Sequence, residues 1–288
     1  MEPGRSSAES EDSDATARPT RPSYLPCYVP MDLIDAGALL AAGLAAGTVN
    51  AVAGGGSLIT FPTLVAIGLP PVPANVTNSI AVCPGYLASV YGSRQDLVAL
   101  SAARGRHTLL ELLPATILGT VAGCTLLLAT PARAFELVVP FLVLGAAAVL
   151  AFQERLREVV GHPRHMSRRR RGLMLHAMVG LGAVYGGYFG AALGVMLVAA
   201  LGLVLDESLA RISALKNAIS AVVGLGTMAA FAVFGPVNWA AVAVLAPATL
   251  VGGYAGARLA RRLPADALRA AIVAIGVVVG VILLIRAT

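Results

Sequence analysis

Three consecutive glycines, Gly54 to Gly56, interrupt an apolar stretch and constrain the fold more than any other feature of this sequence. Together with Pro62 they disfavour a continuous helix. In a bilayer, such irregular backbone persists only where it is buried in protein or lines a water-filled cavity. Ser57 can cap a new helix after the glycines, and the positive end of that helix would face whatever occupies the break. A tight loop, or close helix packing through the glycines, is the alternative interpretation.

The composition predicts that most of the chain lies in a membrane. Of its 288 residues 57% are hydrophobic and 12% are charged, and the mean hydropathy is +0.80. Soluble domains carry roughly 25% charged residues. Long apolar runs without alternation predict helical spans. The net charge of +6 comes from arginines in short loops, which is typical of membrane topology, so we expect no nucleic-acid partner.

The apolar segments fall into two halves of five. We expect a disordered polar tail over residues 1–31, a first transmembrane repeat over 32–153, a basic cytoplasmic linker over 154–172 and a second transmembrane repeat over 173–288. The tail has no apolar region typical of a signal peptide, so the first segment would itself direct insertion. The segments are expected at about 33–53, 57–69, 74–92, 108–130, 134–153, 173–190, 191–205, 209–234, 238–260 and 266–286, with a basic loop between the third and fourth.

One decapeptide occurs in both halves. Residues 114–123 (PATILGTVAG) and 247–256 (PATLVGGYAG) are identical at six positions. A half with an odd number of spans, here five, starts and ends on opposite sides of the membrane, so the second half would be inverted relative to the first. Replacing two of the spans by a re-entrant pair would leave the number odd and the conclusion unchanged. The positive-inside rule then places the linker in the cytoplasm and both termini outside. The predicted fold is an all-α integral membrane protein of the plasma membrane, a polytopic helical bundle of two inverted repeats with broken or re-entrant helices.

A second glycine-rich break, Gly186 to Gly190, occupies the corresponding place in the second half. Inverted repeats with broken helices are typical of secondary transporters, whose substrate binds near the membrane midplane. We therefore expect polar residues of both halves to converge on one cavity beside Gly54, Gly55 and Gly56. They are Asn50, Ser57, Asn75, Thr77 and Asn78 from the first half, and Tyr185, Tyr188, Ser213, Lys216 and Asn217 from the second.

Lys216 is the single lysine of the chain and lies inside an apolar segment. An intramembrane cation costs ~2.5–3.5 kcal/mol on insertion scales. Two interpretations are open: the side chain faces the cavity as a countercharge for an anion, or it snorkels to the cytoplasmic surface. Glu111 and Glu136 lie near segment ends and do not balance it. A small anionic substrate therefore fits better than a metal cation.

The sequence offers little for catalysis or metal binding. The four histidines and three cysteines form no cluster with metal-ligand spacing. Gly54 to Gly56 lacks the Lys-Ser/Thr of a phosphate loop. We predict no metal, no cofactor and no enzymatic activity. An intramembrane enzyme and a non-transporting scaffold are the alternatives, and a homodimer is left open.

Both halves of the sequence resemble a known family. The stretch Asn50-Ala-Val-Ala-Gly-Gly-Gly-Ser57 with Pro62, followed by Ala74-Asn-Val-Thr-Asn78, is similar to the first repeat of the TauE/SafE sulfite exporter-like transporters. Ala214-Leu-Lys-Asn217 and residues 235–239 (GPVNW) are similar to the second repeat. The resemblance covers about residues 33–286, and Tyr188-Phe-Gly190 departs from it by lacking a GGGS. It implies an inverted-repeat permease that moves small sulfur-containing anions such as sulfite or organosulfonates, often outward. We therefore expect a permease for anions such as sulfite, thiosulfate or organosulfonates, and we expect it to work by alternating access. A permease for another small anion or metabolite is the alternative.

Overall fold

The computed structural model of this chain describes residues 31–52, 54–104, 107–152, 155, 167–259 and 265–287. These residues form eleven helices and contain no strand. The first half contains α1 (Leu33–Val52), α2 (Ser57–Ala66), α3 (Pro71–Gly92), α4 (Arg94–Arg104), α5 (His107–Ala129) and α6 (Ala132–Ala151). The second half contains α8 (Arg168–Tyr188), α9 (Leu193–Val204), α10 (Leu209–Phe234), α11 (Trp239–Leu259) and α12 (Ala265–Ala287). The predicted tail up to residue 30, most of the predicted linker, and Arg261 and Arg262 lie outside the described residues.

Prolines and a glycine mark several helix ends. Pro71 opens α3 instead of ending the preceding segment, because the first position of a helix needs no backbone N–H. Pro131 precedes α6 in the same way, and Gly235 ends α10.

Two stretches predicted as basic loops are helical. Residues 94–104 form α4, which contains no glycine or proline and is rich in leucine, alanine and arginine, all good helix formers. Residues 168–171 form the first turn of α8, where the Ser167 side chain accepts a hydrogen bond from the backbone N of Arg170 at 3.4 Å. The prediction was wrong there because charge marks the membrane boundary but does not end a helix.

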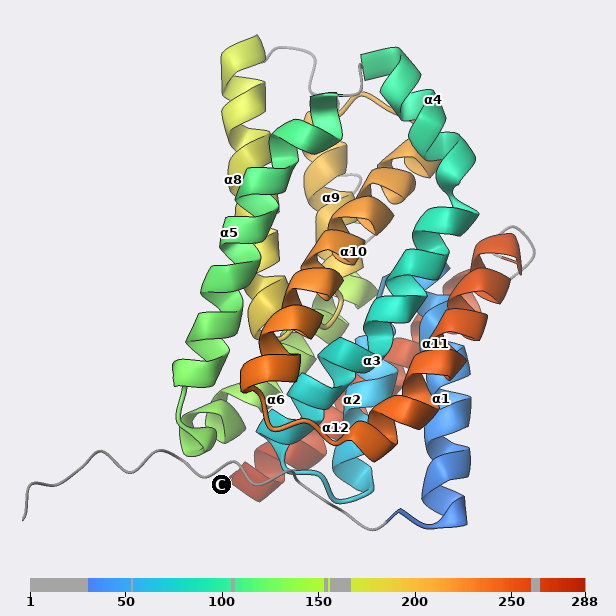
Figure 1. The fold of residues 1–288 in the computed structure, drawn as a ribbon, viewed down its shortest axis with the longest axis vertical. Helices are drawn as coiled ribbons and strands as arrows, with labels where there is room; N and C mark the ends of the chain where they lie inside the picture. The colour runs from blue at the N-terminus through green and yellow to red at the C-terminus, as the bar shows by residue number, and fades with distance from the viewer. Residues whose placement is uncertain are drawn as a thin grey trace, which may run out of the picture.

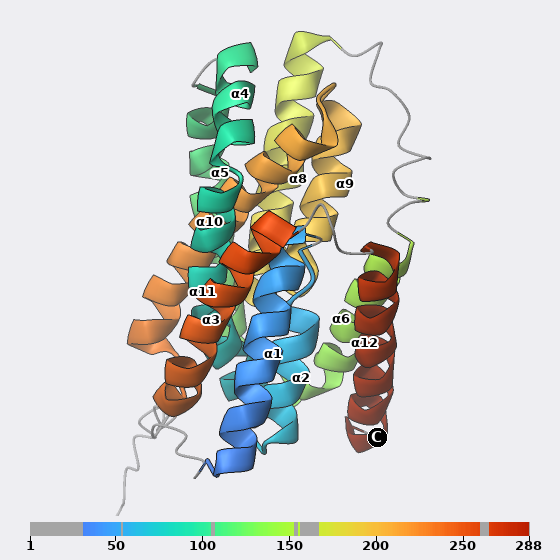
Figure 2. The same ribbon diagram turned by 90° about the vertical axis from the view of Figure 1, so that its right-hand side faces the viewer.

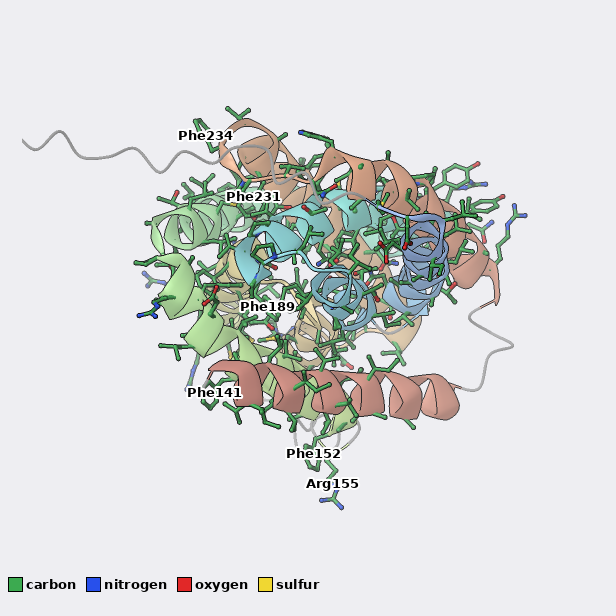
Figure 3. The ribbon with its side chains drawn as sticks, turned by 90° about the horizontal axis from the view of Figure 1, so that it is seen from below. Phe141, Phe152, Arg155, Phe189, Phe231 and Phe234 are labelled. Atoms are coloured by element: carbon green, nitrogen blue, oxygen red, sulfur yellow. The ribbon has the colours of Figure 1, made fainter. Side chains whose placement is uncertain are left out.

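The outer surface of the bundle is apolar. Five helices, α1, α5, α6, α10 and α11, contain segments long and apolar enough to cross a bilayer. Figure 3 shows Phe141, Phe152 and Phe234 projecting outward, and they are exposed over 63%, 54% and 69% of their surface. Phe189 and Phe231, in contrast, are buried. A chain with so many exposed apolar side chains is suited to a lipid environment, and the predicted all-helical membrane protein is confirmed.

The helix contacts come in matching pairs across the two halves (Figures 1 and 2). Helix α1 packs on α11 as α5 packs on α8; α3 contacts α11 as α10 contacts α5. Helix α2 lies against α1 as α9 lies against α8, while α3 contacts α10 and α6 contacts α12.

The repeated decapeptides lie on α5 and α11 and explain two of these contacts. A Cβ atom on Gly123 would lie 2.1 Å from the backbone O of Val184 in α8. One on Gly256 would lie 2.5 Å from the Cα of Thr48 in α1. The last glycine of each decapeptide therefore lets its helix approach a helix of the other half at backbone distance.

Candidate functional site

Both helix breaks close with the same backbone hydrogen bond. The N of Gly54 donates to the O of Val49 at 2.9 Å, and the N of Gly190 donates to the O of Tyr185 at 3.0 Å. Both glycines have a left-handed φ, +91° at Gly54 and +73° at Gly190, which suits glycine because it has no Cβ. After each break a short helix, α2 or α9, begins.

The first break touches the first turn of α9 at two glycines, Gly54 and Gly194. A Cβ atom on Gly54 would lie 2.5 Å from the Cα of Gly194, and one on Gly194 would lie 2.6 Å from the Cα of Gly54. Real Cβ atoms do not approach other atoms so closely. Contact between the two halves at this point is therefore made by backbone alone.

A side chain stabilises each break from within. The Oδ1 atom of Asn50 accepts a hydrogen bond from the N of Gly56 at 2.8 Å. The hydroxyl of Tyr185 donates to the O of Ala191 at 2.7 Å. Each bond spans its own loop and fixes the angle between the two helices that the loop joins.

Each break also receives a hydrogen bond from a helix of the other half. Lys216 of α10 donates from Nζ to the O of Asn50 at 3.1 Å, and Asn75 of α3 donates from Nδ2 to the O of Tyr188 at 2.9 Å. Both acceptors lie in the last turn of a helix, where carbonyls lack an intrahelical donor. A cation beside the negative end of α1 is also favourable. Through these bonds, a helix of each half holds the break of the other half in place.

The side chain of Lys216 points into the protein. Only 1% of its surface is exposed, and its Cδ packs against Gly194. Snorkelling to the surface is therefore excluded in this conformation. Among the described residues, no carboxylate lies within 4 Å of its Nζ. The protein provides a buried cation without a protein anion.

A small cavity of about 20 Å³ lies between the breaks. This is room for about one water molecule. Ser57 and Leu193, the first residues of α2 and α9, both line it. The positive ends of two short helices, one from each half, therefore border the same space. The polar residues that line it are Ser57, Asn78, Ser79, Tyr86 and Thr227.

Of the thirteen predicted site residues, Ser213 lies on α10 and does not line the cavity, and the other twelve fall into three groups. Ser57 and Asn78 line the cavity, and the side chain of Asn78 also accepts a hydrogen bond from the hydroxyl of Thr60. Others form the breaks or bond to them: Asn50, Gly54, Gly55, Gly56, Asn75, Tyr185, Tyr188 and Lys216.

Thr77 and Asn217 lie away from the cavity in this conformation. The hydroxyl of Thr77 accepts a hydrogen bond from the N of Asn238 at 3.0 Å, ahead of α11. The Nδ2 of Asn217 donates to the O of Ser89 at 3.4 Å and to the hydroxyl of Ser93 at 3.1 Å, near the end of α3.

Sequence reasoning missed Ser79, Tyr86 and Thr227. Tyr86 follows Asn78 by two helical steps of four residues, so the two share a face of α3. That spacing was a usable signal. The sequence gives no such signal for Thr227, because its segment contains several polar residues and nothing in the sequence shows which face of that helix points inward.

Aromatic rings surround the second break. Phe189 stacks edge-on against Phe61 of α2, with ring centroids 5.3 Å apart, and lies 6.3 Å from the ring of Phe135 in α6. Figure 3 shows Phe189 near the middle of the bundle. Such contacts add ~0.5–1.5 kcal/mol each beyond their buried area, and they fix the ring of Phe189, which lines the cavity.

Two buried polar atoms at the breaks have no partner, the Nδ2 of Asn50 and the Oδ1 of Asn75. An unpaired buried donor or acceptor costs ~1–3 kcal/mol. A ligand that accepted a hydrogen bond from Asn50 would recover that energy. The first break thus carries an unpaired donor on the same residue whose backbone oxygen accepts the hydrogen bond from Lys216.

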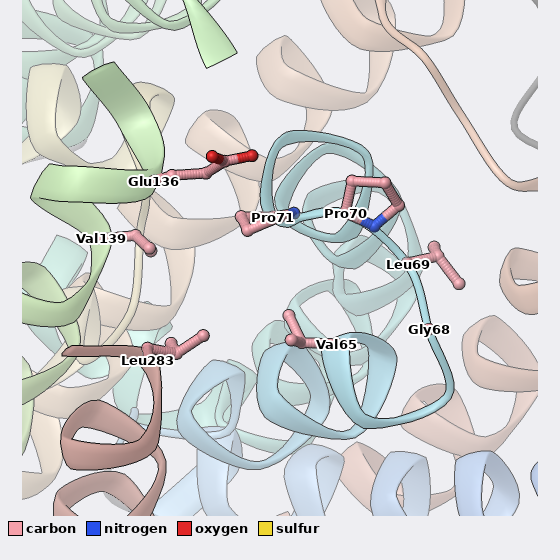
Figure 4. A pocket seen from close by; sticks show the side chains of 8 residues that line it. All are labelled: Val65, Gly68, Leu69, Pro70, Pro71, Glu136, Val139 and Leu283. Atoms are coloured by element: carbon pink, nitrogen blue, oxygen red, sulfur yellow. The ribbon is translucent and has the colours of Figure 1, made fainter. Parts of the chain in front are cut away.

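A larger pocket lies elsewhere, between the α2–α3 turn, α6 and α12 (Figure 4). Its volume is about 310 Å³, and its lining is apolar apart from the carboxylate of Glu136. A lone carboxylate repels anions, and none of the residues of either break lines this pocket. The cavity between the breaks is therefore the better candidate site.

Comparison with known proteins agrees with the sequence pattern. The family profile described as sulfite exporter TauE/SafE matches residues 39–283. The chain is 30% identical over 230 residues to "Probable membrane transporter protein YfcA" of Escherichia coli (strain K12), covering 79% of this chain and 80% of that protein. It is 28% identical over 222 residues to "Probable membrane transporter protein" of Haemophilus influenzae, covering 77% and 83%. No solved structure matches the chain.

Proposed function

This chain belongs to the sulfite exporter TauE/SafE family, and we propose that it carries small sulfur-containing anions such as sulfite, thiosulfate or organosulfonates across the plasma membrane. The observation that carries the proposal is the cavity between the breaks, with the first residues of α2 and α9 in its lining. Helix N-termini attract anions through their free N–H groups and their dipole. The curated relatives are named only as probable membrane transporters, so the anion is our inference.

The charge balance supports an anion. Lys216 is buried without a carboxylate partner among the described residues. Its amine bonds Asn50, whose Nδ2 is unpaired. An anion that entered beside Asn50 would gain a donor and a nearby positive charge, whereas a cation would be repelled. Charge-assisted hydrogen bonds of this kind are roughly twice as strong as neutral ones.

We propose further that the two halves are inverted repeats of one unit. The matching helix contacts, the matching backbone bonds at Gly54 and Gly190, and the glycine contacts of both decapeptides support this. The hairpin of α1 and α2 and that of α8 and α9 extend from the cavity in opposite directions (Figure 2). Each would be the gate to one side of the membrane.

Alternating access then follows from the contacts at the breaks. A cavity of about 20 Å³ is too small for an organosulfonate, so the substrate requires a rearrangement. Opening one gate would break the bond from Lys216 to Asn50, and opening the other would break the bond from Asn75 to Tyr188. Each bond holds one hairpin to a helix of the other half.

Anion flux into proteoliposomes tests the proposal. The panel is sulfite, thiosulfate, sulfoacetate, taurine, sulfate and acetate, each compared with empty liposomes. We expect uptake of at least one of sulfite, thiosulfate, sulfoacetate and taurine, competed by the others of these four and not by acetate. Uptake restricted to acetate or sulfate would favour a permease for a different small anion. No uptake of any compound by folded protein would contradict the transport proposal.

A further inference from the structure

An open groove of about 540 Å³ lies on the outer surface between α3 and α11, which are adjacent at the front of Figure 1. Its lining consists of Leu87, Ala88, Tyr91, Leu250, Val251 and Tyr254. None of these residues belongs to the breaks or to the cavity between them. In a membrane protein, an apolar groove of this kind on the outer face is filled by a hydrocarbon chain.

Two arginine–tyrosine pairs form one end of the groove. The Cζ of Arg94 lies 4.3 Å from the ring centroid of Tyr91, and the Cζ of Arg258 lies 4.4 Å from that of Tyr254. The two tyrosine rings are 6.4 Å apart and tilted by 30°. Each arginine is thus held over a ring by a cation–π contact, and both positive charges gather at the same end.

Neither guanidinium is neutralised. Within the described ranges, no carboxylate lies within 4 Å of Arg94 or Arg258. A cation–π contact occupies the face of a guanidinium and leaves its edge donors free for hydrogen bonds. Guanidinium edges match phosphate oxygens in geometry and charge. The groove therefore combines an apolar floor with a cationic end that can bind an anion.

We propose that this groove binds one anionic phospholipid, with an acyl chain along the floor between α3 and α11 and the phosphate at Arg94 and Arg258. Tyrosine is enriched at the level of lipid headgroups. Basic sites between transmembrane helices bind anionic headgroups on the cytoplasmic side, where the positive-inside rule puts both arginines. A second copy of the chain would leave the two guanidiniums facing their own symmetry equivalents, which is electrostatically unfavourable.

Native mass spectrometry of the delipidated full chain tests this site. The probes are phosphatidylglycerol and phosphatidylcholine with identical acyl chains. We expect one tightly bound phosphatidylglycerol. Each arginine near a membrane surface contributes ~1 kcal/mol, or about fivefold in affinity. The double variant Arg94→Ala/Arg258→Ala should therefore lose roughly thirtyfold in phosphatidylglycerol affinity. The matched control Arg133→Ala, an exposed arginine at the start of α6, should bind like the unaltered chain.

A second variant tests lipid binding in the groove without changing any charge. Val251 is 57% exposed and lines the groove, so Val251→Trp fills the groove without disturbing the core. It should weaken both lipids alike. Equal binding of the two lipids by the unaltered chain, or full phosphatidylglycerol binding by the double arginine variant, would overturn the proposal. So would a lipid-free dimer that Val251→Trp dissociates, because the groove would then be an interface between two copies.

Discussion

The amine of Lys216 and the backbone oxygen of Asn50 lie 3.1 Å apart, and their hydrogen bond joins α10 of one half to the end of α1 in the other. Asn50 in turn holds Gly56 through its side chain. A single residue of the first break is therefore bonded to both sides of the candidate site.

Replacing Lys216 by methionine should lower anion flux at least tenfold, while the protein still reaches the membrane. The substitution removes a charged hydrogen bond worth ~1.5–3 kcal/mol but also the insertion cost of a buried cation. Lys216→Arg should not restore flux, because a planar guanidinium is a poor substitute for the compact amine packed against Gly194. Flux is measured per molecule at the surface.

Arg211→Ala is the matched control, since it removes a cation that pairs with Glu207 near the start of the same helix. It should keep normal flux. Normal flux in Lys216→Met would leave the helix ends at the cavity as the sole anion-binding device.

Alanine substitutions of three asparagines should affect the KM for the anion differently, depending on where each asparagine lies. Asn50→Ala and Asn78→Ala each remove one neutral group worth ~1 kcal/mol, so the KM for the anion should rise several-fold. Asn217→Ala is the control, because Asn217 bonds Ser89 and Ser93 at the end of α3 and, unlike Asn78 and Asn50, neither lines the cavity nor belongs to a break. Its KM should stay unchanged. An equal rise for all three would mean that the asparagines act through packing.

Replacing each of three glycines by alanine should distinguish the destabilisation caused by backbone strain from that caused by steric clash. Gly54 has a positive φ, and a Cβ atom on it would lie 2.5 Å from backbone. Gly68 has a positive φ, with nothing within 4 Å of its Cβ position. A Cβ atom on Gly55 would meet nothing closer than Leu150 at 3.4 Å. A left-handed alanine costs ~1–2 kcal/mol. The unfolding temperature in detergent should therefore be lowest for Gly54→Ala, moderately reduced for Gly68→Ala and nearly normal for Gly55→Ala. Equal temperatures for the first two would mean that the two halves separate freely at Gly54.

The proposed topology can be tested by labelling in a Cys27→Ser background, since Cys83 and Cys124 are buried. Ser167→Cys, just before α8, should react with an impermeant reagent only from the cytoplasm. Ala132→Cys, at the start of α6, should react only from outside. The two residues are exposed and separated by one span, α6. Reaction of both from one face would contradict the inverted arrangement.

The sequence predicts the helices better than it predicts the site. The starts of α3 at Pro71 and of α6 after Pro131 follow from local chemistry, because proline fixes its own φ and suits the beginning of a helix. The side-chain directions of Asn75, Thr77 and Asn78 do not follow from local chemistry. A helix turns through 100° per residue, so Thr77 lies far around the helix from Asn75 and bonds near α11 instead of the second break. Tertiary packing decides which face of α3 and α10 meets the cavity.

The contact between Gly54 and Gly194 also has a genetic consequence. When a larger residue damages a packed interface, a smaller residue on the opposite side usually restores the fit. Here the opposite residue has no side chain to give up, because both partners are already glycine. A selection for second-site suppressors of Gly54→Ala should therefore return true revertants, or changes that shift α9 as a whole, and never a substitution at residue 194.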